Sequence, residues 1–576
     1  MKSLIAVTII ILLVMFNSAL LSARPFTSPP DTDNRQRSIT GQIIFDAKTD
    51  DMMYVQLYKL PESSAGTPRN PSKTYIYSTK PDMQVLLFAE SPRFSLKDLP
   101  AGYFVVVGFQ DLNENEQLDF EPAEPWGWFT SEPGGPIEVI DLTQSETATA
   151  DCTLRVATPL PKFGKTAENG QLRWMEGLPV LQLSGTPEQR GYAHGNLIAR
   201  QILDFFEFYI IEESWRSYQR YQKTFYPFVK TRFNCPAEFI TECDAVIKGM
   251  KDSGVDMKIP YLNRDFDRYD LLAINAYIEK RAANPVEAAA SCTQFAFWGR
   301  KTQSSGLAGG LIAARNMDGE CDIRKVTVSH FLLFAVDPAD PQRKRWFSAM
   351  WPGFVGTISG INEDGLYSME NAGPSGPGPV VGGIVPCSWT QRFILENADA
   401  DATPKSILEM MQPFAGEGGG VTAPGSIILW ATPNQDQKYP AFVYEGDRNG
   451  GSMRFPTNVR PIDPDNIMAS NHHKIYGCLP GETDICFGKK VTGSTLKRYN
   501  DGMKLLEAWS EQDNTNLGLA QAIQCLQTVA HGTTEYSIIF EANNKRILIA
   551  VDDLRPDAWD APFKKWTAFQ FNDLFK

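Results

Sequence analysis

Histidine is scarce in this chain, and the catalytic motifs that depend on it are absent. Only five histidines occur among the 576 residues, namely His194, His330, His472, His473 and His531. The sequence has neither the Gly-x-Ser-x-Gly elbow of serine hydrolases nor the His-Glu-x-x-His helix of zinc hydrolases. Its glycine-rich stretch at 416–420 lacks the Lys-Ser or Lys-Thr ending of a phosphate-binding loop. Zinc hydrolysis and nucleotide chemistry therefore have no support.

Positive charge is also in short supply. The net charge is −13, and no run of five or six like charges stands out. This balance argues against nucleic acid or an anionic membrane surface as a partner, and the acidity favours solubility. Apolar residues make up 43% of the chain, so each of the roughly two to four domains expected at this length can bury a core.

The first 23 residues are predicted to be a secretory signal. Lys2 gives the positive start, residues 4–16 form an apolar stretch, and residues 21–23 offer a small-residue cleavage site. The alternative is an uncleaved membrane anchor, but the apolar run is short and Pro25 follows it. No later stretch approaches about 18 uninterrupted apolar residues, so we expect a secreted or periplasmic protein without an integral membrane segment after signal removal.

Cysteine is sparse for a disulfide-rich scaffold. The nine cysteines include two pairs with the same seven-residue gap, Cys235 with Cys243 and Cys478 with Cys486. Either pair is a candidate for a local disulfide in an oxidising compartment, although spacing alone does not establish connectivity. Because the count is odd, at least one thiol has no partner within the chain.

Residues 38–155 are predicted to form a small β-sandwich. Strand-like stretches at 41–45, 53–58 and 103–109 are separated by clusters of Pro, Gly and Asp. The stretch 104–115, followed by Glu124-Pro-Trp-Gly-Trp128, resembles the carboxypeptidase-regulatory-like β-sandwiches that are appended to exported bacterial enzymes. That resemblance implies an accessory module.

One loop of this module carries alternating oxygen side chains. Asp111, Asn113, Asn115 and Asp119 are spaced so that their oxygens can converge on a hard cation such as Ca²⁺. Glu116 stands at the sharp-turn position where a calcium loop prefers glycine. A possible calcium site and a polar hairpin loop therefore both remain open.

Residues 156–170 are predicted to be a linker, and a mainly helical segment is expected over 171–291. A helix start is indicated at Thr186, with Pro187 in the first turn and Gln189 positioned to complete a capping box. Aromatic and aliphatic residues follow at helical spacing.

From Cys292 to the end, residues 292–576, the pattern changes to hairpins with interleaved helices. Turn signals at 362–365 and 543–544 separate pairs of strand-like stretches, whereas 405–411 and 495–509 are predicted helices. This mixture predicts an α+β fold of packed antiparallel sheets covered by helices.

The thiol of Cys292 is the leading candidate for a nucleophile. Small residues at 288–291 precede it and β-forming residues follow it. If the Ser291–Cys292 bond is cut, Cys292 gains an α-amine with a pKa of about 8, which can accept the thiol proton without any histidine. The alternative is a buried structural cysteine at a strand start.

Arg315 and Asp318 follow on the next predicted strand. A hairpin of this length would return both side chains to Cys292, where the guanidinium lowers the thiol pKa and the carboxylate holds the α-amine. A surface ion pair at a strand end is the alternative.

These residues occur in the order of a known family. Ser291-Cys292-Thr293, then residues 315–318, then 360–366 with Asn371, resemble the acyl-coenzyme A:6-aminopenicillanic-acid acyltransferase family and the related choloylglycine hydrolases. The stretches 185–195, 469–472 and 494–499 also fit, so the resemblance spans roughly 178–553. It implies a self-cleaving N-terminal-nucleophile hydrolase with a four-layer αββα fold.

The resemblance also implies a role for each matched residue. Cys292 would be both the autocleavage residue and the nucleophile, tuned by Arg315 and Asp318. Asn371 would form part of the oxyanion hole, Asn471 would assist at the same centre, and Arg498 would complete the polar network. The loop at 299–310 is longer than the tight turn of choloylglycine hydrolases, and a long segment precedes Cys292. Both departures favour the acyltransferase-like branch, with the two processed chains remaining associated.

The expected activity is hydrolysis of a linear amide, or acyl transfer, through an acyl-Cys292 intermediate. The substrate would be a small-molecule amide with an acyl group, and no cofactor is required. An exported location makes coenzyme A an unsuitable acyl donor, which favours hydrolysis. Two alternatives stay open: a phospholipase-B-like lipid hydrolase with the same cysteine, and a non-enzymatic protein that binds a surface partner through the β-sandwich.

Overall fold

The structure is a computed structural model, and it divides the chain into two compact units. It describes residues 36–45, 52–61, 79–88, 90–121, 123–283, 291–319, 322–379, 382–433, 436–459, 465–512, 515–555 and 559–576. The first unit comprises Met1–Glu132 with Pro136–Val156, and the second comprises Pro133–Gly135 with Ala157–Lys576. The predicted signal at 1–23 lies outside the described residues.

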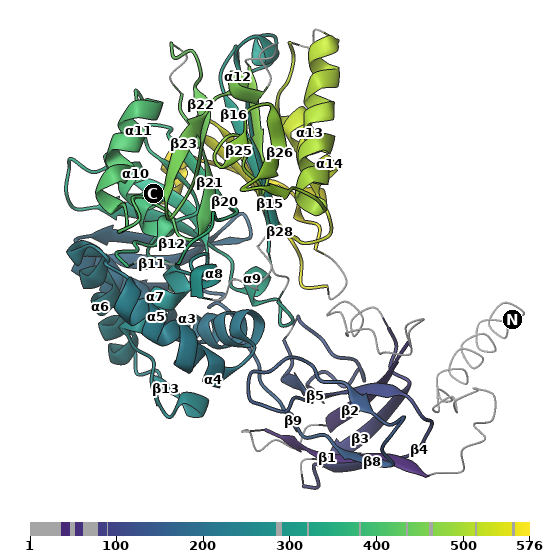
Figure 1. Cartoon of the computed structure of the whole chain (residues 1–576). Helices are drawn as coiled ribbons and strands as arrows, with labels where there is room; N and C mark the ends of the chain where they lie inside the picture. The colour runs from purple at the N-terminus through teal and green to yellow at the C-terminus, as the bar shows by residue number, and fades with distance from the viewer. Residues whose placement is uncertain are drawn as a thin grey trace, which may run out of the picture. The chain divides into compact units, whose positions relative to one another are not determined.

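Two small β-sheets make up the described part of the first unit (Figure 1). One sheet contains β4 (Arg93–Leu99), β1 (Arg37–Ile44), β8 (Thr147–Thr149) and β9 (Cys152–Thr153), and the other contains β3 (Met83–Phe88), β2 (Met52–Leu60), β5 (Tyr103–Asp111), β6 (Trp126–Trp128) and β7 (Ile140–Asp141). Side chains from both sheets, such as Ile43, Val55 and Val106, meet in one apolar core. The strands expected at 41–45, 53–58 and 103–109 correspond to β1, β2 and β5.

A ten-stranded sheet dominates the second unit. Its order is β10 (Lys165–Ala167), β11 (Gly170–Met175), β12 (Leu178–Gly185), β17 (Leu332–Pro338), β18 (Trp346–Met350), β19 (Ser359–Asn362), β20 (Tyr367–Ala372), β21 (Gly425–Ala431), β22 (Ala441–Asp447) and β23 (Gly450–Arg454). Neighbouring strands are antiparallel except for β12 and β17, which run parallel. The expected turn at 362–365 connects β19 to β20, and the Asn362 side chain accepts the backbone N–H of Leu366.

The strands β11 and β12 differ from the expectation of a mainly helical segment beginning at residue 171. They form a tight hairpin in which Met175 is opposite Leu178, so the turn contains only Glu176 and Gly177. Both turn residues have positive φ, as a two-residue hairpin turn with the native twist requires. Apolar side chains of β12 then pack on β17, and helices begin only after Gly185.

Helices follow β12 over most of the segment up to residue 283. They are α3 (Pro187–Phe205), η1 (Phe206–Trp215), α4 (Tyr218–Arg220), η2 (Tyr221–Phe225), α5 (Tyr226–Arg232), α6 (Ala237–Asp252), α7 (Arg268–Asn275) and α8 (Lys280–Ala283). The start of α3 confirms the predicted capping box, because the Thr186 side chain accepts the Gln189 N–H and the Gln189 side chain accepts the Thr186 N–H. The short pair β13 (Lys258–Ile259) and β14 (Arg264–Asp265) lies between α6 and α7.

A six-stranded antiparallel sheet carries the residues around Cys292. Its order is β24 (Asn466–Ala469), β15 (Ser291–Phe297), β16 (Ile312–Asp318), β28 (Thr534–Glu541), β29 (Arg546–Val551) and β30 (Thr567–Gln570). The expected hairpin around 543–544 joins β28 to β29. Helices α13 (Ser494–Glu511) and α14 (Leu519–Val529) pack on this sheet through residues such as Phe295, Leu506 and Leu526 (Figure 1).

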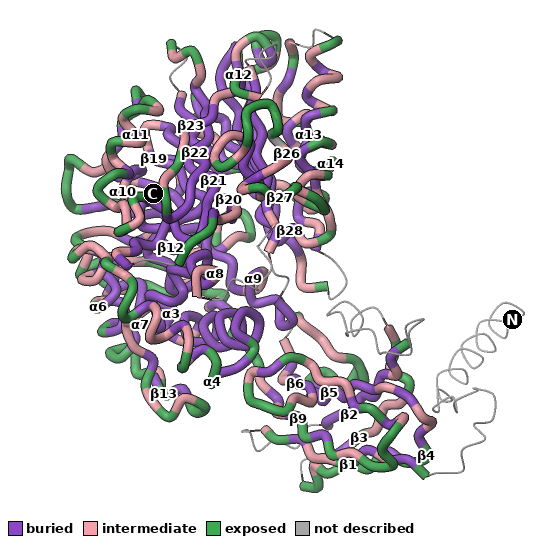
Figure 2. The backbone as a smooth tube through the Cα atoms, in the orientation of Figure 1, coloured by how far each residue is buried: buried purple, intermediate pink, exposed green. Residues whose placement is uncertain are grey.

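The two large sheets lie against each other. Strand β15 contacts β20 and β21 of the ten-stranded sheet, and the central strands of both sheets are buried (Figure 2). Helices α10 (Cys387–Asn397) and α11 (Pro404–Met411) accompany the ten-stranded sheet, and α10 contacts β19 and β20. The remaining short elements include α9 (Val326–Ser329), α12 (Pro456–Val459), β25 (Cys478–Leu479), β26 (Glu482–Cys486) and β27 (Lys489–Lys490).

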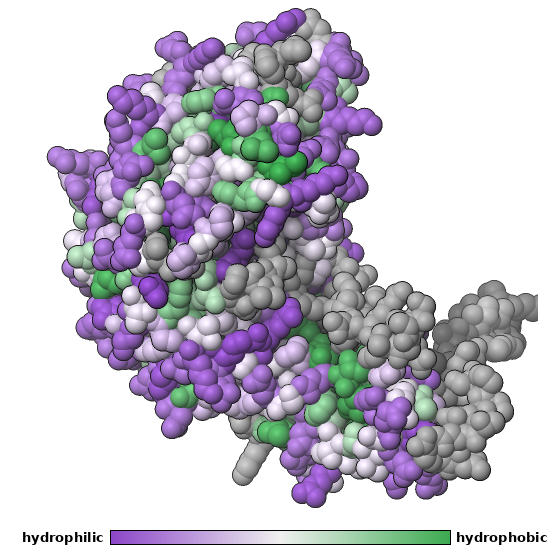
Figure 3. Space-filling model, in the orientation of Figure 1, coloured by the Kyte–Doolittle hydropathy of each residue, from purple (hydrophilic) through white to green (hydrophobic). Residues whose placement is uncertain are grey.

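The surface carries mostly polar and charged residues. In the face shown in Figure 3, hydrophilic residues predominate over the second unit and apolar residues form small groups between them. Among the residues that the structure describes, no helix combines the length and the apolar character needed to cross a membrane.

Candidate active site

Cys292 is the second residue of β15, and the β15–β16 hairpin returns two charged residues to it. In the pairing register Ser291 is opposite Asp318 and Gln294 is opposite Arg315. The Arg315 side chain shares a face with that of Cys292, and its Nη2 lies 3.2 Å from the Cys292 Sγ. The loop at 299–310 leaves this register intact, because Phe297 and Ile312, on either side of the loop, are opposite each other.

The environment of the thiol has opposing effects on its pKa. Cys292 is 1% exposed, and this burial raises the pKa of its thiol because a thiolate loses its hydration. The positive charge of Arg315 lowers the same pKa, whereas the negative charge of Asp318 raises it. The guanidinium is fixed by its other contacts, since it also donates to the Ser359 hydroxyl and to the carbonyls of Ile358 and Glu370. A positive charge is therefore held rigidly beside the sulfur.

Asp318 is a fully buried carboxyl group with one unsatisfied oxygen. Its Oδ1 accepts the Thr534 hydroxyl at 2.5 Å, whereas its Oδ2 has no hydrogen-bond partner. Burial raises the pKa of Asp318, and the charges of Arg498 and His531 lower it. The Oδ2 atom lies 3.5 Å from His531 Nε2 and 3.8 Å from Arg498 Nη1. The Asp318 Oδ2 can therefore still accept a hydrogen bond near Cys292, the residue whose α-amine would be released by cleavage.

Two asparagines and Arg498 hold the backbone of Cys292. The Asn471 Oδ1 accepts the Cys292 N–H at 2.7 Å and also accepts from Arg498 Nη2 at 2.8 Å. The Cys292 carbonyl accepts from Arg498 Nη1 and, at 3.4 Å, from the Asn371 amide. Asn371 is the penultimate residue of β20, Asn471 follows β24 and Arg498 lies in the first turns of α13. The other five predicted catalytic residues thus come together around Cys292.

The autocleavage position is described only in part. Ser291 begins β15 and is partly exposed, whereas residues 284–290 lie outside the described residues. The Cys292 N–H is already fixed by Asn471 in the uncut chain. The atom that would become the α-amine is therefore positioned before any bond is broken.

Buried aromatic residues pack together in the core cluster that includes Cys292. Tyr277, which precedes the cleavage position, lies within 6.3 Å of Trp351 and 6.0 Å of Phe354 between ring centroids. Tyr536 lies 6.0 Å from Trp351 and donates to the Ala349 carbonyl. Burial raises the pKa of both tyrosines, and their proximity to Cys292 raises it further.

His531 is a member of this cluster that the sequence analysis did not select. It is 22% exposed at its side chain, and its Nδ1 lies 2.9 Å from the Thr533 hydroxyl. It reaches Asp318 because β28 pairs with β16. The one feature of the sequence that could have indicated His531 is its position just before a predicted strand. It reaches the site only because two segments more than two hundred residues apart pair with each other.

The other histidines have contacts that fit packing. His194 lies in α3, is 1% exposed and accepts the Gly353 N–H at 3.1 Å. Burial lowers its pKa to about 3. His472 and His473 follow Asn471 at the end of β24 and contact Tyr499 and Tyr476. No histidine of the described residues hydrogen-bonds to the Cys292 sulfur.

The loop predicted as a possible calcium site is held together by its own hydrogen bonds. Both Asp111 oxygens accept backbone N–H groups, and the side-chain amides of Asn113 and Asn115 donate to the Asp119 Oδ2 at 2.7 and 2.6 Å. The oxygens of Asn113 and Asn115 accept backbone N–H groups as well. Asp111 Oδ2 and the oxygens of Asn113 and Asn115 each keep a lone pair that no N–H group occupies, so the calcium site stays a prediction. Across the described residues no group of three or more His, Cys, Asp or Glu side chains is arranged to hold a metal.

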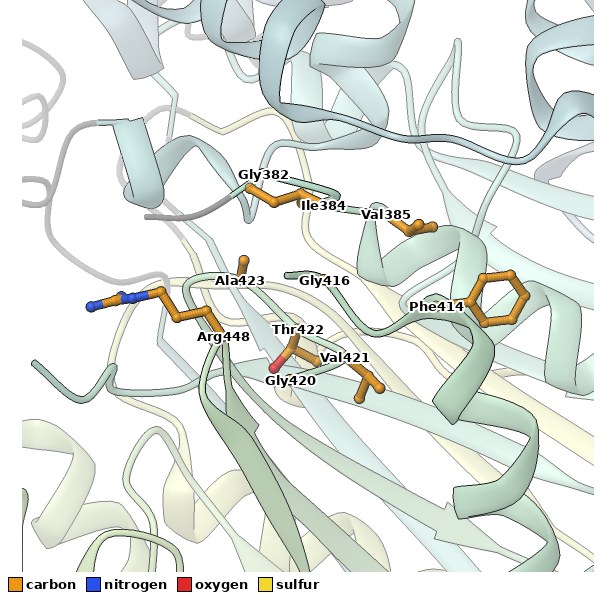
Figure 4. Close-up of a pocket in the computed structure, with 10 residues that line it drawn as sticks. All are labelled: Gly382, Ile384, Val385, Phe414, Gly416, Gly420, Val421, Thr422, Ala423 and Arg448. Atoms are coloured by element: carbon orange, nitrogen blue, oxygen red, sulfur yellow. The ribbon is translucent and has the colours of Figure 1, made fainter. Parts of the chain in front are cut away.

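A pocket beside β22 does not include the predicted site residues. Figure 4 shows its lining, which comes from the loop at 382–385, from Phe414, from residues 416–423 and from Arg448. Backbone and small side chains form most of its wall. This pocket therefore does not mark the place where a substrate would reach the thiol.

Comparisons with known proteins give limited information. No family model matches the chain, and no curated protein matches it. Among solved structures, a Caenorhabditis elegans ortholog of N-acylethanolamine-hydrolyzing acid amidase has 14% identity and a TM-score of 0.30, covering 48% of this chain and 99% of its own. A variant of the conjugated bile acid hydrolase from Clostridium perfringens has 10% identity and a TM-score of 0.30, covering 49% and 93%.

A third structure, penicillin V acylase from Agrobacterium tumefaciens, has 13% identity and a TM-score of 0.24, covering 45% of this chain and 83% of its own. TM-scores this low do not support a conclusion about the fold or the activity of this chain. The function of this chain has to be inferred from the chemistry of the site around Cys292.

Proposed function

We propose that this chain is an exported, self-processing cysteine amidohydrolase of the N-terminal-nucleophile type. In this proposal the two large sheets and their helices form a four-layer αββα core. The enzyme would cleave a linear amide through an acyl-Cys292 intermediate. The observation that carries the proposal is the environment of Cys292. Its buried thiol lies 3.2 Å from Arg315, and its backbone N–H and carbonyl both hydrogen-bond to polar side chains. A structural cysteine has no need of this arrangement.

The first step would be cleavage of the chain itself. The Cys292 sulfur attacks the Ser291 carbonyl carbon, and the C–N bond breaks to give a thioester and the free amine of Cys292. Water then hydrolyses the thioester, which leaves a carboxylate on Ser291 and restores the thiol. Asn471 holds the departing nitrogen at 2.7 Å, and the unsatisfied Asp318 Oδ2 is available to accept from the ammonium group that forms.

The second step would use the same atoms on an external amide. The α-amine accepts the thiol proton, the thiolate attacks the substrate carbonyl, and the ammonium group returns a proton to the leaving amine. Water then releases the acid from the acyl-cysteine. The Asn371 amide, which donates to the Cys292 carbonyl at 3.4 Å, would serve as an oxyanion donor, and one such donor is typically worth about 3–4 kcal/mol.

The surroundings of the thiol support an acyl group with apolar character. Tyr277, Trp351, Phe354 and Tyr536 belong to the same apolar core cluster as Cys292. An exported enzyme has no supply of coenzyme A thioesters, so water is the favoured acceptor. The residues named here need no cofactor for these steps.

Mass spectrometry and N-terminal sequencing of the purified protein would test this proposal. We expect wild-type protein to consist of two pieces, the second beginning at Cys292, and Cys292→Ala to remain one chain. Cys235→Ser, which removes a half-buried thiol elsewhere, should be cut like the wild type. Folded wild-type protein that stays uncut would overturn the proposal.

The substrate class needs a separate assay. We expect cut wild-type protein to hydrolyse N-acyl amides and Cys292→Ala to be inactive. Preferential hydrolysis of phospholipid esters would instead indicate a lipid hydrolase. No turnover of either class by fully cut protein would contradict the proposed activity.

A further inference from the structure

A short three-stranded sheet follows the loop that carries Asn471. It consists of β25, β26 and β27, and its first two strands place Cys478 opposite Cys486. The two Sγ atoms are 3.2 Å apart. We propose that this pair is a redox site that closes to a disulfide and thereby fixes the loop that positions Asn471.

The backbone around the pair has the geometry that a cross-strand disulfide needs. The Phe487 N–H donates to the Gly477 carbonyl at 2.7 Å, so Cys478 and Cys486 occupy the non-hydrogen-bonded position between the strands. Opposing Cα atoms at such a position are about 4.5 Å apart, which lies within the range that disulfides span. Closing the bond therefore requires side-chain rotation and no displacement of either strand.

The sulfur atoms are connected to the active site by a short segment. The His473 carbonyl accepts from Cys478 Sγ at 3.4 Å and from Cys486 Sγ at 3.0 Å, and His473 is two residues after Asn471. On the other side of the loop, Glu445 Oε2 accepts the backbone N–H of Lys474 at 2.9 Å. One side of the loop is thus held by a buried carboxylate and the other, in the reduced form, by two weak S–H donors. Oxidation removes these two donors and puts a covalent bond between β25 and β26 in their place.

The two thiols differ in accessibility and in acidity. Cys486 is 6% exposed, whereas Cys478 is only partly buried. The hydrogen bond from Cys478 lowers the pKa of Cys486, burial and the negative charge of Glu445 oppose that effect, and the positive charge of Lys474 adds to the lowering. The same hydrogen bond raises the pKa of Cys478. The thiolate is the form that attacks a disulfide, so this pair combines an accessible thiol with an acidified neighbour.

Oxidation would proceed by exchange with a small-molecule disulfide. The Cys486 thiolate attacks the oxidant to form a mixed disulfide and releases one thiol. Cys478 then loses its proton, attacks the Cys486 sulfur, forms the internal S–S bond and releases the second thiol. Two protein S–H groups are oxidised, one S–S bond of the oxidant is reduced to two thiols, and the protons pass to the released thiols.

The other cysteine pair with the same spacing is arranged differently. Cys235 precedes α6 and Cys243 lies within that helix, and no hydrogen bond joins their sulfur atoms in the described part of the chain. The equal gaps in sequence therefore lead to different geometries. Only the Cys478–Cys486 pair combines opposed strands with a direct sulfur–sulfur contact among the described cysteines.

Peptide mapping of the full-length protein would test the bond itself. Protein equilibrated in a buffer of oxidised and reduced glutathione is alkylated at its free thiols and digested without reductant. We expect one linked peptide pair joining Cys478 to Cys486 with the loss of two hydrogen atoms, absent in Cys478→Ser and retained in Cys235→Ser. Alkylation of both cysteines in folded, equilibrated wild-type protein would overturn the proposal, as would bonding of either one to another cysteine.

Hydrogen exchange would test whether the bond fixes the loop. We expect backbone amides of residues 474–476 to exchange at least about tenfold more slowly in oxidised than in reduced wild-type protein. Cys478→Ser should exchange at the same rate in both buffers. Equal rates in oxidised and reduced wild type, with the disulfide present, would refute the effect on the loop. Neither measurement uses amide hydrolysis, so these results are independent of the proposed function.

Discussion

Single residues in this site perform more than one task, and Arg315 is the clearest case. Its Nη2 contacts the Cys292 sulfur, while the same guanidinium donates to carbonyls of the facing ten-stranded sheet. The planar group therefore links the nucleophile on one sheet to the strand that carries Asn371 on the other. A lysine offers one point charge in place of this fork of donors.

We predict that Arg315→Lys slows self-cleavage by roughly ten- to hundredfold, since a hydrogen bond to a charged group contributes about 1.5–3 kcal/mol. Arg315 lowers the pKa of the Cys292 thiol, so a weaker contact from lysine should raise that pKa. The pH at which the cleavage rate increases should then also be higher. The measurement is the rate of fragment appearance in freshly synthesised protein across a pH series. Arg300→Lys, an exposed arginine in the same hairpin, is the matched control. An unchanged pH profile in Arg315→Lys would contradict the role assigned to Arg315.

His531 is predicted to act through Asp318. The charge of His531 lowers the pKa of Asp318, whose carboxylate must be ionised to hold an ammonium group. His531→Gln should therefore raise the Asp318 pKa and move the acidic limb of the amide hydrolysis rate to higher pH. Asp318→Asn should lower the rate at every pH. A His531→Gln enzyme whose activity falls by the same factor at all pH values would indicate a purely structural role.

At the scale of elements, close packing of helices depends on glycines in α3 and α6. A Cβ atom at Gly195 would lie 2.0 Å from the Val246 carbonyl oxygen, and one at Gly249 would lie 2.1 Å from the Tyr192 carbonyl oxygen. The backbones of the two helices therefore approach each other directly. Neither contact is with a flexible side chain that could move aside.

We predict that Gly195→Ala destabilises the second unit by about 1–3 kcal/mol, because the helices must separate to admit a methyl group. Thermal unfolding followed by circular dichroism would measure the change. Gly306→Ala is the control, since a Cβ atom there meets nothing within 4 Å. Equal unfolding temperatures for both variants would show that the α3–α6 contact tolerates expansion.

The segment before the cleavage position contains a buried acid, Glu279, whose Oε1 accepts the Cys387 N–H at 2.7 Å. Burial raises the pKa of Glu279 well above its ordinary value, and the nearby charge of Glu370 raises it further. The folded chain therefore binds this proton more tightly than the unfolded chain does. That stabilisation is present below the ordinary carboxyl pKa near 4.5 and is lost as the pH rises through the folded value.

We predict that the uncut Cys292→Ala chain loses stability as the pH rises from about 5 to about 8, and that adding Glu279→Gln reduces the loss. At neutral pH the double variant should unfold about 1 °C higher for each kcal/mol regained, because the entropy of unfolding grows with length and Ala157–Lys576 makes up most of this unit. Glutamine retains an oxygen that can accept the Cys387 N–H. A double variant with the same pH dependence as Cys292→Ala would exclude Glu279 as the titrating group.

Local signals in the sequence predicted individual elements well, but they could not predict which distant strands pair with each other. The capping box at Thr186 and the turns at 362–365 and 543–544 depend on a few neighbouring residues, and each is present. The pairing of β12 with β17 joins residues far apart in the chain and leaves no local trace. His531 was missed for the same reason. Arg315 and Asp318 were accessible to sequence reasoning because one hairpin connects them to Cys292.

At the scale of the whole second unit, the cleavage position divides a continuous sheet. The strands β10, β11 and β12 precede Ser291, whereas β17 to β23 follow it, and all ten belong to one sheet. The parallel β12–β17 pairing runs from Val180 with Leu333 to Gly185 with Pro338. The buried core likewise mixes residues from both sides of the cut, such as Ile202 with Trp351. Cleavage would therefore remove one covalent bond and leave this packing in place.

We predict that the two pieces remain one particle after cleavage at 291–292. Separating them would expose the apolar core to water, at about 25 cal/mol per Å² of apolar surface, and would break the β12–β17 hydrogen bonds, each worth about 0.5–1.5 kcal/mol net. Size-exclusion chromatography with light scattering should give the same mass for the cut wild type and for uncut Cys292→Ala, with two bands appearing only on a denaturing gel. Cut and uncut proteins should also unfold in a single transition of the second unit, because both pieces share its core. Dissociation of the pieces in native buffer would show that the β12–β17 interface is not continuous after cleavage, and would require the sheet to reorganise when the chain is cut.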